Sequence, residues 1–169
     1  FSTADAVGGN SNRVRISFEG DNRIYVAADD SAGSNYHSTT ATYTDGAWHH
    51  LVVAVDTTQA VAADRIKLYV DGSEITDFAT PAYPAQNTNL LVSQSGAGQY
   101  IGRLSTYSGY HHEGGLKEVQ LIDGQALAAS AFGTSASGSW ETNAYTGSFG
   151  TGGFRLDFAD AGAGGSDSS

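Results

Sequence analysis

The sequence predicts an all-β protein built as a two-sheet antiparallel sandwich. Short segments alternate apolar and polar residues, and turn signals such as Asp71-Gly72 and Asp123-Gly124 separate them. No stretch has the length and periodicity of a long helix. The 22 glycines and two prolines suit a chain with many tight turns. Turn signals at this spacing are typical of β-sandwiches.

The first predicted strands form a hairpin. Residues 1–12 are expected to be an entry loop, and residues 13–19 alternate strictly, as a half-buried strand does. Residues 23–27 return after a Gly-Asp-Asn turn as the hairpin partner. A further Thr-rich strand is expected within residues 36–43. The side chains predicted to face the core from the first strand are Val14, Ile16 and Phe18.

The middle of the chain carries the strongest signal. Residues 51–55 are apolar on both faces, which favours a central strand. A polar, Ala-rich loop with one helical turn is expected at residues 57–64. Residues 66–70 alternate again, and Asp71-Gly72 supplies the positive φ angles of a type I′ turn. Residues 75–78 are expected to complete this hairpin.

The last third predicts shorter elements and ends in a linker. Strands are expected at residues 90–92, 99–103, 116–122 and 154–158, with one helical turn within 126–132. We expect one domain over residues 1–158 and a Gly/Ser/Asp-rich linker at 159–169. Because the chain begins with Phe1 and has no Met, we expect it to be an internal piece of a longer polypeptide or a processed product. The predicted core includes Val53, Val55, Ile66, Leu68, Val70, Val119, Leu121, Phe154, Leu156 and Phe158.

Composition excludes several classes of function. With 18 acidic and 8 basic residues the net charge is −10, which argues against nucleic-acid binding and against attraction to anionic membranes. Cysteine is absent, so disulfides, Cys-zinc sites and Cys nucleophiles are excluded. No apolar run is long enough to span a bilayer, and we expect no membrane insertion.

Two segments resemble a known family. Trp48-His49-His50 precedes the apolar strand, and Tyr69-Val70-Asp71-Gly72 ends the next one. Tyr100-Ile101-Gly102-Arg103 is followed by a Gly-Gly-Leu-Lys-Glu-Val-Gln-Leu-Ile-Asp-Gly-Gln-Ala-Leu run at residues 114–127. These patterns resemble the laminin-G-like, concanavalin A-type jelly roll. They depart from it at one position, where Glu113 or Gly114 stands in place of the aromatic residue that commonly precedes the glycine. The resemblance implies a jelly-roll sandwich that binds ligands and is not an enzyme.

The C-terminal segment resembles a narrower group. Ala131-Phe132-Gly133, Trp140 and the run from Tyr145 to Phe158 are similar to the tails of such domains in bacteriophage structural proteins. This resemblance implies an extracellular module on a virion appendage such as a tail fibre. Its partners would be a cell-surface glycan or other virion proteins within a larger oligomeric assembly. Two alternatives stay open, a carbohydrate-binding accessory domain of a secreted bacterial protein and a purely structural subunit-contact module.

A Tyr-rich loop is the main candidate for ligand binding. Tyr107, Tyr110, His111 and His112 lie close together in sequence. Aromatic rings stack on the apolar faces of sugars, and imidazoles hydrogen-bond to hydroxyl groups. The alternative is that this loop only covers one end of the sandwich.

Metal binding and catalysis receive less support. Calcium is a possible cofactor, for which the loop acids Asp29, Asp30, Asp56 and Asp64 could supply oxygen ligands, but they form no ordered calcium loop and also suit solvated turns. His49 and His50 point to opposite sides of an extended chain and are expected to pack or hydrogen-bond beside the core strand. No clustered carboxylate pair of the glycosidase type is present, so no catalytic residues are assigned. Trp48 and Trp140 are expected to anchor the core or an interface.

Overall fold

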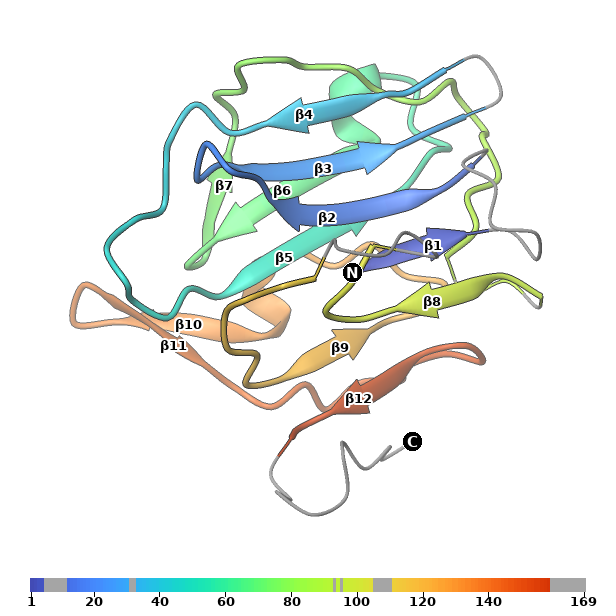
Figure 1. The fold of residues 1–169 in the computed structure, drawn as a ribbon. Coiled ribbons are helices and arrows are strands. Elements are labelled where there is room, and N and C mark those ends of the chain that lie inside the picture. Colours follow the sequence, from blue (N-terminus) through green and yellow to red (C-terminus); the bar gives the residue numbers. More distant parts are fainter. Residues whose placement is uncertain (5–11, 31–32, 93, 95, 105–110, 159–169) are drawn as a thin grey trace.

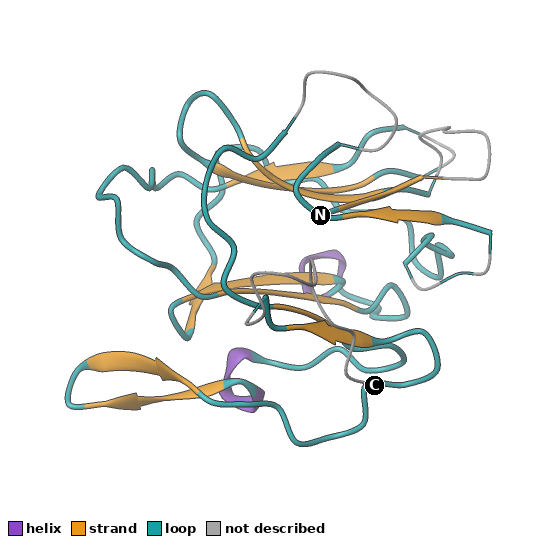
Figure 2. Cartoon of the chain, turned by 60° about the horizontal axis from the view of Figure 1, so that its bottom comes forward, coloured by secondary structure: helices purple, strands orange, loops and turns teal. Residues whose placement is uncertain are grey.

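The computed structural model describes residues 1–4, 12–30, 33–92, 94, 96–104 and 111–158. The described residues form an antiparallel β-sandwich, which confirms the predicted fold class. Two layers of strands face each other, and the chain passes between them through long connections (Figures 1 and 2).

The first layer is a five-stranded sheet. β2 and β3 form the predicted hairpin, with Phe18 opposite Ile24 and Val14 opposite Ala28. In order across the sheet, the strands are β4 (Tyr36–Ser38), β3 (Ile24–Ala28), β2 (Val14–Phe18), β1 (Ser2–Ala4) and β8 (Gly98–Tyr100).

Strand β1 corrects the expectation of an entry loop over residues 1–12. It lies between β2 and β8, with Ser2 opposite both Arg15 and Tyr100. The Thr3 hydroxyl accepts from the backbone N–H of Val14 at 2.9 Å, and both Ser2 and Thr3 are fully buried. The small hydroxyl side chains of Ser2 and Thr3 hydrogen-bond to the backbone of neighbouring segments and produce no apolar alternation, so the sequence pattern missed this strand.

The second layer is built around β5 (Leu51–Val55), β6 (Ile66–Val70) and β7 (Ser73–Ile75). Asp71 and Gly72 have φ angles of 48° and 80°, which confirms the predicted turn with two positive φ angles. β9 (Val119–Leu121) pairs with β12 (Phe154–Leu156) in a separate two-stranded sheet.

A further hairpin follows, which sequence reasoning did not predict. β10 (Gly133–Ala136) pairs with β11 (Ser139–Thr142) around Ser137-Gly138, where φ is 51° and 83°. Apart from Trp140 and Glu141, its strand residues are Ser, Thr, Gly and Ala with little apolar alternation. Figure 2 shows this hairpin projecting beyond the two layers.

The core lies between β2 and β3 on one side and β6 on the other. Ile66, Leu68 and Val70 are buried as predicted, whereas Val53 and Val55 are half-buried and pack against the core from its edge. The other predicted core residues, which belong to β9, to β12 and to the segment just after β12, are only half-buried: Val119, Leu121, Phe154, Leu156 and Phe158. A two-stranded sheet at the margin of a sandwich has one open edge on each side, so it shields its side chains less completely.

Several local predictions differ from the structure. Phe18, expected in the core, is 48% exposed because it stands at the very end of β2. The strand expected at residues 36–43 ends at Ser38, and the one expected at 90–92 does not form, although Leu90 is buried in the core. Two 3₁₀ turns, at Ala62–Asp64 and Ala129–Ala131, confirm the single helical turns. No helix among the described residues is long and apolar enough to cross a membrane.

Candidate functional site

A hollow on the outer face of the five-stranded sheet combines aromatic and charged side chains and is the main candidate site. Arg15, Glu19, Tyr25 and Tyr36 line a space of about 240 Å³. Strand pairing explains why they meet: Arg15 stands opposite Ala27, which stands opposite Tyr36 on the next strand. Their neighbours in sequence face inward, because successive side chains of a strand point to opposite faces. We call these four residues the outer-face site.

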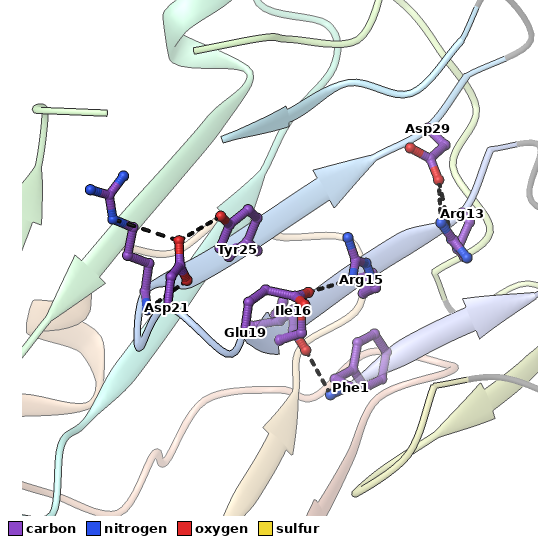
Figure 3. A network of polar contacts seen from close by, with 10 residues as sticks. Phe1, Arg13, Arg15, Ile16, Glu19, Asp21, Tyr25 and Asp29 are labelled. Atoms are coloured by element: carbon purple, nitrogen blue, oxygen red, sulfur yellow. Dashed lines mark hydrogen bonds and ion pairs between the residues drawn. The ribbon is translucent and has the colours of Figure 1, made fainter. Parts of the chain in front are cut away.

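The polar part of the outer-face site is a guanidinium beside a carboxylate. Arg15 Nη1 donates to Glu19 Oε1 at 2.6 Å, and the Ser17 hydroxyl donates to the same oxygen at 2.7 Å. Figure 3 shows Arg15 and Glu19 directed toward each other across the end of β2. Arg15 Nε is buried and has no hydrogen-bond partner among the described residues. The site therefore contains a guanidinium group with one N–H that makes no hydrogen bond to the described residues, beside the Glu19 carboxylate, which is held by two hydrogen bonds.

The aromatic part consists of two neighbouring tyrosines. The Tyr25 and Tyr36 rings are stacked, with centroids 6.2 Å apart and planes at 26°, and Tyr36 is 39% exposed. The Tyr25 hydroxyl donates to Asp21 Oδ2 at 2.9 Å, as Figure 3 shows. This hydrogen bond to the Asp21 carboxylate raises the pKa of Tyr25, so the phenol stays protonated. Both rings come from adjacent strands and so have fixed positions.

This arrangement suits a polar ligand with apolar faces. Stacked rings supply flat apolar surface, while guanidinium and carboxylate groups donate to and accept from hydroxyls. Sequence reasoning missed this site because no motif marks it. The available sequence signal was that residues 13–19 and 23–27 alternate, which places Arg15 and Tyr25 between core residues and therefore on the outward face.

The Tyr-rich loop is only partly described. Tyr107 and Tyr110 lie outside the described residues. His111 forms an isolated bridge with Arg103, and the His112 backbone N–H donates to the Gly102 carbonyl at 2.8 Å. Both imidazoles are exposed, and the His112 ring lies 6.2 Å from that of Phe18. The His112 ring therefore lies beside the end of β2, while the backbone of both histidines is held by residues 102 and 103.

Two of the four acids considered for calcium are buried instead of solvated. Asp29 forms an ion pair with Arg13 at 2.7 Å. Asp30 accepts from the backbone N–H groups of Gly33 at 3.1 Å and Ala85 at 3.0 Å. These contacts give both carboxylates a structural role, tying the end of β3 to the neighbouring loops.

The other two acids share a second hollow, of about 250 Å³, beside β6. Asp56 accepts from the side chains of Thr58 and Gln59, both at 2.6 Å. Lys67 Nζ lies 3.3 Å from Asp64, so an ammonium group already faces that carboxylate. Among the described residues, no group of three or more His, Cys, Asp or Glu is placed to hold a metal ion.

His49 and His50 hydrogen-bond beside the core strand, as predicted. His49 bridges two acids, with Nδ1 2.7 Å from Asp71 and Nε2 3.1 Å from Asp45. The hydrogen bond to Asp71 has the largest effect on the pKa of His49, and it raises this pKa together with the bond to Asp45. His50 Nδ1 accepts from the indole N–H of Trp140 at 3.0 Å, and burial lowers its pKa.

Together these features define an antiparallel sandwich with a polar and aromatic outer face. Residues 1–130 match a laminin-G-type family model described as the concanavalin A-like lectin/glucanases superfamily. The chain belongs to this family, whose domains indicate a carbohydrate-binding or structural module. No curated protein and no solved structure matches the chain. Residues 131–158, which include the projecting hairpin and β12, lie beyond the matched segment.

Proposed function

We propose that this chain is a non-catalytic glycan-binding module and that the outer-face site is where the glycan binds. The main observation behind this proposal is that the stacked Tyr25 and Tyr36 rings lie next to the Arg15–Glu19 pair on one face of the sheet. Ligand sites of this kind combine apolar surface with a few placed polar groups. The net charge of −10 favours a neutral or cationic ligand over an anionic one.

We propose further that the module belongs to a bacteriophage virion appendage and attaches it to the host surface. The support is the similarity of residues 131–158 to the tails of phage structural domains. A shallow, open site gives weak single-site affinity, and repetition of a module on a particle raises overall avidity by linking binding events. The module would then act on the outside of the cell, at the virion surface.

One observation favours a structural role as a second candidate. The hairpin of β10 and β11 pairs with no third strand among the described residues, so both of its outer edges are available for pairing with another chain. In that case the module would decorate or join virion proteins, and the outer-face site would bind no glycan. An accessory carbohydrate-binding domain of a secreted bacterial protein would share the glycan site but would be joined to a catalytic domain.

The test is a glycan array probed with a multivalent form of the protein. We expect the wild type to bind a defined set of glycans and Tyr25→Ala/Tyr36→Ala to lose that binding. The matched control is Val61→Ala, which alters a side chain that is 60% exposed in a loop outside the site. Equal binding by wild type and the double variant would show that the glycan does not bind at the outer-face site. Turnover of a bound glycan by the purified protein would overturn the non-catalytic assignment.

A further inference from the structure

Exposed apolar side chains gather along one short segment at the end of the sandwich. Trp48 is 69% exposed, Phe18 is 48% exposed and Leu116 is 42% exposed. The Phe18 ring lies 6.2 Å from that of His112, and the Trp48 indole lies against Gly115. Segment 112–116 therefore links all three, and we call Phe18, Trp48, His112 and Leu116 the rim patch.

The backbone on both sides of Trp48 is fixed by hydrogen bonds. Before it, the Ala47 N–H donates to Asp45 Oδ1 at 3.0 Å. After it, the His49 ring bridges Asp45 and Asp71, and the His50 N–H donates to Asp71 Oδ1 at 2.8 Å. Asp71 is itself held in the β6–β7 turn. The exposed indole therefore belongs to a loop whose backbone is held in place by hydrogen bonds.

Contact with a glycine positions the indole without covering it. The outer edge of the six-membered ring lies so close to Gly115 that an added Cβ would come within 2.7 Å of Cη2. Gly115 thereby permits an approach that a side chain would block. Because the contact is at the ring edge, and because 69% of the residue stays exposed, the indole presents open apolar surface to solvent.

We propose that Trp48 is a second sugar-stacking platform, which binds the apolar face of a pyranose ring at the rim patch. This inference rests on the proposed glycan-binding function but concerns a site separate from the outer-face site. A held indole loses little conformational entropy on binding, which favours a small rigid ligand. The exposed His112 imidazole lies on the same segment and can hydrogen-bond to sugar hydroxyls.

The chemistry of the rim patch favours a sugar over a protein partner. Stable protein interfaces bury roughly 1,200–2,000 Å² around an apolar centre. Here Trp48 is the most exposed apolar side chain, and the adjoining segments carry the exposed carboxylates of Asp45 and Glu113. One ring flanked by hydrogen-bonding groups matches one monosaccharide in size and polarity.

The experiment compares Trp48→Ala, Gly115→Ala and the control Val61→Ala on an array carrying oligosaccharides of glucose, galactose, mannose and N-acetylhexosamines. Single-site affinity for each glycan that binds is then measured with the free oligosaccharide. We expect Trp48→Ala to weaken binding by up to about tenfold, the size of one stacked ring contact. Gly115→Ala should weaken it as well, since it displaces the ring while keeping the indole. Urea unfolding shows whether each variant is folded.

The outcomes separate the two proposals. Weaker binding by Trp48→Ala and Gly115→Ala, with Val61→Ala unchanged, supports the rim platform whatever the outer-face variants do. Unchanged binding by Trp48→Ala, with loss in Tyr25→Ala/Tyr36→Ala, overturns the rim platform and leaves the outer-face site standing. A wild type that binds no glycan overturns both. A wild-type dimer that Trp48→Ala turns into a monomer assigns the patch to a protein contact and also overturns the inference.

Discussion

Trp140 and His50 join the C-terminal hairpin to the sandwich. The indole Nε1–H donates to His50 Nδ1 at 3.0 Å, and the two rings stack with centroids 5.8 Å apart at an interplanar angle of 20°. Gly72, in the turn between β6 and β7, makes room for the indole, since a Cβ there would lie 2.2 Å from it. A hairpin of two short strands is marginal on its own, so this contact holds it against the domain that the family model matches.

Replacing Trp140 with Phe tests that contact. Phe keeps a ring but removes the donor, and it leaves the half-buried Nδ1 of His50 without its partner. We expect the free energy of unfolding to fall by about 1 kcal/mol, measured by urea denaturation. Trp48→Phe is the matched control, because Trp48 is 69% exposed and should be close to neutral. Equal stabilities of the two variants would show that the indole hydrogen bond contributes nothing.

Leu68 tests the position of the core. Its side chain is 1% exposed and faces β2 and β3 across the sandwich. Leu68→Ala should lower the free energy of unfolding by about 2–5 kcal/mol, from lost burial and the cavity left behind. Leu116→Ala, which makes the same change at a residue that is 42% exposed, should alter stability by no more than about 0.5 kcal/mol. Similar losses in the two variants would contradict the assigned core.

His37 predicts how stability changes in acid. It is 1% exposed, packs against Phe78 and Tyr83, and its Nδ1 accepts from the Ala82 N–H at 3.3 Å. Burial lowers its pKa from 6.5 to about 4. The folded state therefore binds fewer protons than the unfolded state between these values, so stability is full above pH 6.5 and falls as the pH drops toward 4.

The matching variant is His37→Gln, which keeps a hydrogen-bond acceptor and removes the titrating group. Urea unfolding across this pH range should show a smaller loss of stability for His37→Gln than for the wild type. The difference between the two curves isolates His37 from the carboxylates, which titrate in both proteins. Parallel curves would mean that His37 is not buried in its neutral form.

Calcium should leave the stability of the described fold unchanged. Asp29 is paired with Arg13, and Asp64 faces Lys67, so a cation would have to displace these basic groups. We expect the same melting temperature in millimolar calcium and in EDTA. A rise in calcium that Asp56→Asn/Asp64→Asn removes would identify a metal site in the hollow beside β6.

The parts of the fold that the sequence predicted are those where at least one face of a strand is apolar or the turn residues are diagnostic. Residues 51–55 and 66–70 form strands as predicted, and the Asp71-Gly72 turn has its two positive φ angles. The central position expected for residues 51–55 is wrong, because this strand lies at the edge of its three-stranded sheet among the described residues. Strand β1 was missed because Ser2 and Thr3 are buried through hydrogen bonds and not through apolar surface. The hairpin at Ser137-Gly138 was missed because its strands are Ser/Thr-rich and mostly exposed.

The candidate site was harder to predict than the fold. Arg15, Tyr25 and Tyr36 come from three strands, and only the pairing register brings them together. Trp48 was expected as an anchor, yet the hydrogen bonds of Asp45 and Asp71 hold its neighbours so that the indole faces solvent. Such placements depend on contacts between residues far apart in sequence, which no local pattern reveals.

The most direct test of the central claim is a map of amide chemical-shift changes when the glycan found on the array is added to the labelled protein. The account predicts the largest changes at outward-facing positions of β2, β3 and β4, around Arg15, Ser17, Tyr25 and Tyr36, with a separate set near Trp48. Changes confined to the β10–β11 hairpin or to the hollow beside β6, with β2 to β4 unaffected, would contradict it.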